Sequence, residues 1–393
     1  MTGPSRPVLD SRRVRAARLE ATGLRGPGTP GLPAAVERLL AVQGQELQPA
    51  LWGLSRRVDA AARPDRAAAN RSLADGEVLR THVLRPTWHL VRPADVRWLL
   101  ELTAPRVARL MASTERAWDV GDLGPGVDAV AAEVAAGPRT RAELKGALLA
   151  RGVLAADAPG IVFTQTLMHA ELRRLVVSGP PPAGRPEHHQ VYAAFDDRVP
   201  AGYGPLGERF DAEAAVLELW RRYLPGRAFA TVGDLRLWSD IPLADLRRGL
   251  AVLRDAGEVV EVPGAGDLEG LTLVGTTSVA DRWLDDPGRH APGTTRPEVD
   301  LLQAYDELLM SYRETRHVVL DPALPPPDRA GAFVHSLAVD GVVAGRWRWP
   351  ANPPPGGLVD VEVQWLRDAT GSEPEALSEQ VTALAAYLAP TAA

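Results

Sequence analysis

Apolar residues recur at helical spacing through most of the first two thirds of the chain, and they alternate with polar residues mainly in the last third. This change of period predicts helices first and strands later. We expect helices over residues 9–22, 33–43, 49–58, 93–118, 126–136, 160–175, 211–223, 242–255 and 376–389. We expect strands over residues 258–262, 271–274, 317–320, 332–339, 342–349 and 359–366, and a strand pair over 78–91 that turns near Arg85 and Pro86. The pattern predicts the α+β class.

Two helix starts carry the same capping signal. Thr140 is followed three residues later by Glu143, and Thr231 is followed at the same spacing by Asp234, as in capping boxes. In both places a helix precedes the cap, and a further helix and a strand follow, which is the order of a winged helix. We therefore predict an internal repeat of three helix-turn-helix units, of which the first is the most divergent. A generic helical protein with coincidental caps is the alternative that stays open.

The repeat divides the chain into four predicted domains. Three winged-helix units are expected over residues 1–92, 93–200 and 201–265, and a β-rich C-terminal domain over 266–393. A chain of 393 residues that is 45% apolar and 24% charged has the composition of a globular protein with several domains.

The basic residues are 43 Arg and a single Lys, Lys145, and the chain has no Cys. Without Cys the protein can form neither a disulfide nor a thiolate zinc site. Lys145 is followed by Gly146, so the phosphate-binding loop that requires Gly-Lys-Ser/Thr is excluded. A Schiff-base mechanism has only this one side-chain amine to use. The codon bias of a GC-rich genome is another explanation for the excess of Arg.

Charge is distributed unevenly around a net value of −6. Residues 1–100 carry +7, residues 101–250 carry −1 and residues 251–393 carry −12. Because an electrostatic footprint is local, the basic first quarter can hold nucleic-acid phosphate while the tail stays acidic. A solvated, Arg-rich helix face would give the same count. No apolar run reaches the roughly 18 residues of a membrane span, and residues 1–18 lack a secretory signal, so we expect a cytoplasmic protein.

Most familiar catalytic and cofactor motifs are missing. None of the eight His lies in a His-Glu-x-x-His motif, and the adjacent His188 and His189 are poorly spaced to chelate one metal. No Gly-x-Ser-x-Gly nucleophile motif exists. Gly26, Gly28 and Gly31 have dinucleotide-loop spacing, but no strand precedes them and prolines interrupt them. We therefore expect neither a cofactor nor a metal.

The segment Gln43-Gly44-Gln45 lies between two predicted helices in the basic quarter. In an extended backbone, residues two apart point to the same side, so both carboxamides would face one surface. Gly44 would allow a close approach of backbone or substrate. An amide offers donors and an acceptor but does not titrate, which suits positioning a water or a base edge. A polar helix start is the alternative for the same residues.

Several segments together resemble one known family. They are Ala41-Val42-Gln43-Gly44-Gln45, Gln48-Pro49-Ala50-Leu51-Trp52, Leu84-Arg85-Pro86-Thr87-Trp88-His89-Leu90-Val91, Tyr305-Asp306-Glu307-Leu308-Leu309 and Asp340-Gly341-Val342-Val343-Ala344-Gly345-Arg346-Trp347. As a set, the chain is similar to the AlkZ-like and YcaQ-like family of winged-helix DNA glycosylases. The resemblance implies three tandem winged-helix units and a β-rich C-terminal domain that form a C-shaped, concave DNA-binding face.

The resemblance also implies an activity. The family motif is Gln-x-Gln in the AlkZ-like branch and Gln-x-Asp in the YcaQ-like branch, and Gln45 places this chain with the former. Gln43 and Gln45 are then the expected catalytic residues of a monofunctional glycosylase. The implied substrate is double-stranded DNA with N7-alkylated purines, including interstrand crosslinks, as in self-resistance to DNA-alkylating antibiotics.

We expect further residues near the motif to contact DNA. They are Arg56, Arg57, Arg85, Thr87, Trp88, His89 and Arg92. Two alternatives stay open, namely that Trp88 is a core residue and that His89 orients the wing. We expect a monomer, since the sequence has no heptad repeat or obvious dimer helix. The rival interpretation is a non-enzymatic winged-helix protein, either a transcription regulator or a protein that sequesters the adduct.

Overall fold

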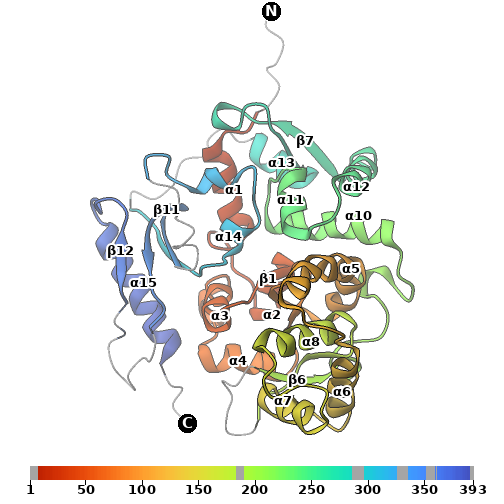
Figure 1. Ribbon diagram of the computed structural model, residues 1–393. Coiled ribbons are helices and arrows are strands. Elements are labelled where there is room, and N and C mark those ends of the chain that lie inside the picture. The colour runs from red at the N-terminus through yellow and green to blue at the C-terminus, as the bar shows by residue number, and fades with distance from the viewer. Residues whose placement is uncertain are drawn as a thin grey trace, which may run out of the picture. The chain divides into compact units, whose positions relative to one another are not determined.

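The computed structural model describes residues 8–182, 190–285, 296–324, 335–350, 359 and 361–389. The chain forms two compact units (Figure 1). Unit 1 comprises residues 1–39, 46–67 and 219–393, and unit 2 comprises residues 40–45 and 68–218. The six residues 40–45, which contain the Gln-Gly-Gln segment, therefore belong to unit 2, although the helices on either side belong to unit 1.

A three-stranded antiparallel sheet brings the motif into unit 2. Strand β1 (Ala41–Gln43) pairs with β3 (Trp88–Val91), which also pairs with β2 (Leu79–His82), so that β3 is central. The register sets Gln43 opposite His89. Helix α4 (Arg66–Ala74) precedes β2, and the sheet leads into the long helix α5 (Pro93–Trp118).

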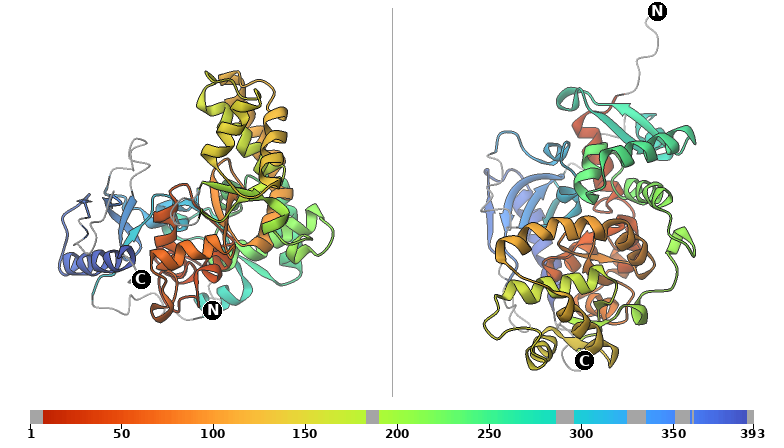
Figure 2. Two further views of the ribbon diagram at one scale, coloured as in Figure 1. Left: turned by 90° about the horizontal axis from the view of Figure 1, so that it is seen from below. Right: turned by 45° about the vertical axis from the view of Figure 1, so that its right-hand side comes forward.

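The rest of unit 2 is a helical group with a second small sheet. Strand order in that sheet is β4-β6-β5, and the apolar core consists of Val127, Val130, Leu144, Leu148, Phe163 and Leu167. Figure 2 shows α6, α7 and α8 packed together at this core. The elements are α6 (Gly124–Ala135), β4 (Arg139–Thr140), α7 (Arg141–Ala150), α8 (Gly160–Leu172), β5 (Val176–Ser178), β6 (Val191–Ala194) and α9 (Phe195–Arg198).

Unit 1 contains a four-stranded antiparallel sheet in the order β12-β11-β10-β9. Helix α15 packs against β9 (Figure 2), and Trp52 of α3 donates its indole N–H to the Leu301 carbonyl of β9 at 3.0 Å. The elements are α2 (Leu32–Leu39), α3 (Leu47–Ser55), β9 (Val299–Leu302), β10 (His335–Val339), β11 (Val342–Trp347), β12 (Val363–Trp365) and α15 (Glu373–Leu388).

The other part of unit 1 is built around the N-terminal helix. Val14 and Ala17 of α1 are fully buried and share a core with Phe229, Trp283 and Val319. Figure 1 shows α12 and α13 beside the β7–β8 hairpin. The elements are α1 (Ser11–Ala21), α10 (Ala212–Tyr223, which begins in unit 2), α11 (Val232–Ser239), α12 (Leu243–Asp255), β7 (Val259–Pro263), β8 (Thr272–Thr276), α13 (Thr277–Leu284) and α14 (Glu307–Met310).

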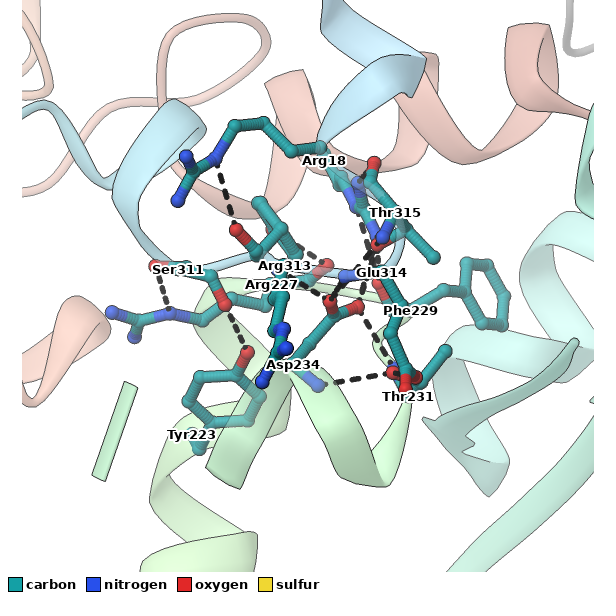
Figure 3. Close-up of polar contacts among 12 residues, drawn as sticks. Arg18, Tyr223, Arg227, Phe229, Thr231, Asp234, Ser311, Arg313, Glu314 and Thr315 are labelled. Atoms are coloured by element: carbon teal, nitrogen blue, oxygen red, sulfur yellow. Dashed lines mark hydrogen bonds and ion pairs between the residues drawn. The ribbon is translucent and has the colours of Figure 1, made fainter. Parts of the chain in front are cut away.

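A buried polar network joins distant segments of unit 1 (Figure 3). Asp234 Oδ1 accepts the backbone N–H groups of Arg313, Glu314 and Thr315, and Oδ2 accepts the Thr315 hydroxyl at 2.5 Å. Arg18 of α1 donates to the Phe229 carbonyl and to the Thr315 side chain. This buried carboxylate is fully hydrogen-bonded, the condition under which a buried charge is tolerated.

The local helix signals are confirmed. Helix α5 spans residues 93–118 as expected, and both predicted capping boxes form, at Thr140 with Glu143 and at Thr231 with Asp234. Among the described residues, no helix is both long and apolar enough to cross a membrane.

Two predicted elements are wrong. Residues 41–43 are a strand instead of the end of a helix, because they pair with β3. Residues 316–319 are a short 3₁₀ helix instead of a strand, because Val318 and Val319 bury their side chains beside α1 without extended pairing. His188, His189 and residues 332–334 of a predicted strand lie outside the described residues. The three boundaries between the four predicted domains stay a prediction.

Candidate functional site

Gln43 ends strand β1 and is only 3% exposed. Its side-chain oxygen accepts a hydrogen bond from Arg85 Nη2 at 2.8 Å. Because a guanidinium can only donate, this bond fixes which end of the carboxamide faces Arg85. The direction of the Gln43 dipole is therefore set by the segment that joins β2 to β3.

Gln45 is exposed, and its side-chain oxygen accepts the backbone N–H of Trp88 at 3.3 Å. Between the two glutamines, Gly44 donates its N–H to the Trp88 carbonyl at 2.8 Å. A Cβ at position 44 would lie 3.1 Å from Leu90 Cγ, so the close approach at this glycine is to strand β3. Both carboxamides bond to residues of the 85–88 segment, and the prediction that they face one surface stays a prediction.

Arg80 of β2 holds the backbone of the motif. Its Nε donates to the Gly44 carbonyl at 3.0 Å, and its Nη2 donates to the Gln45 carbonyl at 3.2 Å. The guanidinium also lies over the Trp88 ring, with Cζ 4.2 Å from the centroid. Burial lowers the pKa of Arg80 to about 10, so it stays protonated at neutral pH. Sequence reasoning missed Arg80, although it is one of the arginines of the basic first quarter.

Trp88 is held from behind by a second polar pair. The His82 ring lies 4.7 Å from the Trp88 ring, and His82 Nδ1 contacts the buried carboxylate of Glu171 on α8. Arg80, Trp88 and Glu171 line a small cavity together with Ser178, Gln190 and Tyr192. Trp88 is half-buried, so both alternatives, a DNA contact and a core residue, stay open.

The turn that carries Arg85 has a strained backbone. Leu84 is fully buried, yet its φ is +66°, a conformation that costs energy for a residue with a branched side chain. Arg85 N–H bonds the Val83 carbonyl and Thr87 N–H bonds the Arg85 carbonyl, each at 2.7 Å, which makes two successive γ-turns. Leu40, directly before β1, has a φ of +62°. Strain of this kind concentrates at functional sites.

Two predicted DNA contacts do not fit the structure. His89 is fully buried in the central strand, and its Nδ1 bonds the Thr87 carbonyl at 2.9 Å, so the alternative that it orients the wing is the better description. Arg57 is 2% exposed, and its donors are taken by Thr22, Gly53 and Asp306, the last at 2.7 Å. Its burial and its ion pair with Asp306 leave the Arg57 guanidinium inaccessible to a phosphate.

The other predicted contacts remain proposals. Arg85 is half-buried and bonded to Gln43, and Arg92 is half-buried at the N-cap position of α5. The Thr87 hydroxyl is buried without a hydrogen-bond partner among the described residues. Arg56 belongs to unit 1, whereas Gln43 and Gln45 belong to unit 2.

The burial of His89 predicts a pH dependence of stability. Burial, with a smaller contribution from the charge of Arg85, lowers the pKa of His89 to about 3. The unfolded chain binds this proton near pH 6.5, so between about pH 6.5 and pH 3 the unfolded state holds more protons. The free energy of unfolding should therefore decrease as the pH is lowered from about 6.5 to about 3, by about 1.4 kcal/mol per pH unit for one group.

Urea unfolding of the wild type and of His89→Gln between pH 4.5 and pH 7 measures this slope. The slope of the free energy of unfolding against pH should be smaller in His89→Gln by the contribution of one group, about 1.4 kcal/mol per pH unit. Burial also lowers the pKa of His335, to about 4. His335 therefore contributes to the pH slope with the same sign, and His335→Gln should remove that contribution. Equal slopes for wild type and His89→Gln would contradict a neutral, buried His89.

The comparisons with known proteins agree on one family. A family model described as DNA glycosylase AlkZ-like matches residues 36–387. The chain is 27% identical over 347 residues to an interstrand DNA cross-link repair glycosylase of Streptomyces sahachiroi, covering 86% of this chain and 87% of the relative. The solved structure of Streptomyces sahachiroi DNA glycosylase AlkZ has a similar fold, with a TM-score of 0.72 at 24% identity over 96% of this chain and 97% of that chain. Since the family model spans most of the sequence, the chain belongs to the AlkZ-like family of DNA glycosylases.

Proposed function

We propose that the chain hydrolyses the N-glycosidic bond of N7-alkylated purines in double-stranded DNA, with Gln43 and Gln45 as the catalytic residues. The observation that carries the proposal is that two carboxamides on one short segment bond the same strand connection, Gln43 to Arg85 and Gln45 to Trp88. The groups are preorganised and uncharged. That arrangement suits a reaction in which water must be positioned and no proton must be given to the leaving group.

The chemistry of the lesion explains why neutral side chains are sufficient. Alkylation at N7 makes the purine a cation, so the bond between C1′ and N9 can break with its electron pair going to the base. The base leaves neutral, and positive charge develops on the sugar. Water then attacks C1′ and loses a proton to solvent, which leaves an abasic site. The dipoles of Gln43 and Gln45 stabilise the developing charge and hold the water.

The two glutamines differ in solvent exposure, and we assign them different roles on that basis. Gln45 is exposed, and its oxygen has a second lone pair beside the one that accepts Trp88 N–H. It can accept a hydrogen bond from the attacking water. Gln43 is buried in the DNA-free protein, where its oxygen is bonded to Arg85. Arg85 is also a proposed phosphate contact, and its transfer from Gln43 to a DNA phosphate would release the Gln43 oxygen for the lesion.

The helical repeat supplies the proposed DNA-binding frame. Two element orders support the winged-helix interpretation, namely α6, β4, α7, α8, β5, β6 and α10, α11, α12, β7, β8. The first proposed winged helix contains β2 and β3 and is divided between the two units. Arg85 and Arg92 are the proposed phosphate contacts beside the motif. N7 is exposed in the major groove, so a lesion there can be reached with little base flipping.

The relative from Streptomyces sahachiroi supports a wider substrate class. Its name describes repair of interstrand DNA crosslinks, and we propose that bulky N7 adducts and crosslinks are substrates here as well, in self-resistance to a DNA-alkylating natural product. The family match favours the enzyme over a non-enzymatic DNA-binding protein.

The first test measures base release by the wild-type protein. We expect free base from duplexes that contain N7-methylguanine, a bulky N7 adduct or an N7-linked crosslink, and none from undamaged DNA. The product should be an intact strand with an abasic site, because the single lysine, Lys145, is exposed on α7 in unit 2 and is not part of the motif. Borohydride should trap no covalent complex. No release from any of the three lesions would contradict the proposal, and a trapped adduct that Lys145→Ala abolishes would contradict a monofunctional mechanism.

The second test separates two roles of Arg85. If Arg85 moves to a DNA phosphate, Arg85→Ala should weaken DNA binding and reduce the slope of log K against log salt by about 1. The single-turnover rate at saturating DNA should stay within a few-fold of wild type. Arg97→Ala is the matched control, because Arg97 of α5 is bonded to Asp196 at 2.7 Å. The slope of log K against log salt should be the same in Arg97→Ala as in the wild type. A variant with an unchanged slope and a rate reduced by roughly 10²-fold or more, the usual cost of losing a preorganised catalytic dipole, would show that Arg85 permanently positions Gln43.

A further inference from the structure

Arg56 and Arg57 are neighbours at the end of α3 with opposite surroundings. Arg57 is bonded to Asp306 and to two backbone carbonyls. Arg56 lies over the Trp52 ring, with its Cζ 5.6 Å from the centroid, and no carboxylate or hydrogen-bond acceptor contacts its guanidinium among the described residues. Arg56 is half-buried, and a cation that is partly withdrawn from water without a counter-ion is unfavourable.

The field around Arg56 is mainly repulsive. Burial, followed by the charge of Arg63, lowers the pKa of Arg56 to about 10, and Arg25 and Arg57 add to this, whereas Asp300 opposes it. Arg56 nevertheless stays protonated at neutral pH. The structure therefore keeps a charged guanidinium among other guanidinium groups.

Arg56 borders a cavity of about 280 Å³ within unit 1. The cavity lies among the segment after α1, the end of α3, the start of β9 and the helix α15. Besides Arg56, its polar lining comprises Arg25, Arg296, Glu298, Asp300, Glu379 and Gln380. Its volume is ample for a tetrahedral oxyanion. The lone cation thus has space beside it that no side chain fills.

The other charged groups of the cavity already have partners. Arg25 makes a bidentate bond with Asp300, at 3.1 and 2.8 Å, and also contacts Glu298. Arg296 is paired with Glu379 at 2.8 Å. The side-chain oxygen of Gln380 is buried without a partner among the described residues, and a half-turn of this amide would present N–H donors in its place. Arg56 and Gln380 are therefore the groups left to bind a ligand.

We propose that this cavity binds a phosphate-type oxyanion, with Arg56 as its counter-ion. A charge-assisted bond to a phosphate oxygen would give the half-buried guanidinium the counter-ion that it lacks. Inorganic phosphate and a phosphate of the DNA backbone share this chemistry. The site does not depend on the glycosylase activity, since it rests on a cavity of unit 1, whereas Gln43 and Gln45 belong to unit 2.

Thermal unfolding of the full chain with inorganic phosphate tests the site. At constant ionic strength, replacing chloride with phosphate should raise the Tm of the wild type progressively, because a ligand that binds the folded state stabilises it. Arg56→Met should have a higher Tm than the wild type without phosphate, since an unpaired, half-buried charge is removed, and it should not respond to phosphate. A phosphate response retained in Arg56→Met, or absent from the wild type, would overturn the proposal.

Two controls separate the cavity from general effects of charge. Arg57→Met should have a lower Tm than the wild type, because it leaves Asp306 unpaired, and it should keep the phosphate response. If Arg57→Met does not fold, Arg221→Met serves instead, since Arg221 is half-exposed and paired with Glu258 at 2.7 Å. A loss of the phosphate response in Arg221→Met as well would contradict a site that depends on Arg56.

DNA binding distinguishes the two sources of phosphate. If a DNA phosphate occupies the cavity, phosphate should compete with undamaged duplex DNA, and Arg56→Met should reduce the slope of log K against log salt by about 1. If the occupant is a free phosphate, Arg56→Met should bind DNA as the wild type does. Both results presuppose the Arg56-dependent Tm shift. Absence of base release in the wild type would contradict the proposed function and leave this site unaffected.

Discussion

The pairing of β1 with β3 is the constraint on which the candidate site depends. Residues 40–45 join unit 2 because Ala41, Val42 and Gln43 hydrogen-bond strand β3 in one register. A slip of one residue would turn Gln43 to the other face of the sheet. Once the register is set, Gly44 packs on Leu90, the Gln45 oxygen reaches the Trp88 N–H, and Arg85 comes within a hydrogen bond of Gln43. The chemistry proposed for the two glutamines is thus a consequence of backbone pairing.

Arginine has several physical roles in this chain besides contact with DNA. Arg18 and Arg57 hold distant segments of unit 1 together through buried bonds to Thr315 and Asp306. Arg80 clamps the motif through backbone carbonyls in unit 2. Each donates hydrogen bonds to oxygen acceptors, which offset the cost of burying a guanidinium. Arg56 has no such partner among the described residues, which is why the proposed anion site is assigned to it and not to its neighbour. The count of arginines in the first hundred residues could not separate these roles.

Local signals in the sequence predicted the local structure well. Helix α5 and the two capping boxes follow from side-chain spacing within one or two turns, so 93–118, Thr140 and Thr231 were found from the sequence. Features that depend on distant partners were not found. Strand β1 forms by pairing with β3, and Arg57 differs from Arg56 in its bonds to Thr22 and Asp306, which lie far from it along the chain. The glutamines were identified by their motif and the resemblance it carries, whereas the clamp by Arg80 required the fold.

The central claim is that the carboxamides of Gln43 and Gln45 carry out the hydrolysis. The most direct measurement is single-turnover release of base from a duplex with one N7-methylguanine, with DNA binding measured in parallel. The double variant Gln43→Ala, Gln45→Ala should lose at least roughly 10²–10³-fold in rate and still bind DNA, whereas Gln48→Ala, a glutamine of α3 outside the motif, should keep its rate. Release by the double variant at the wild-type rate would contradict the account.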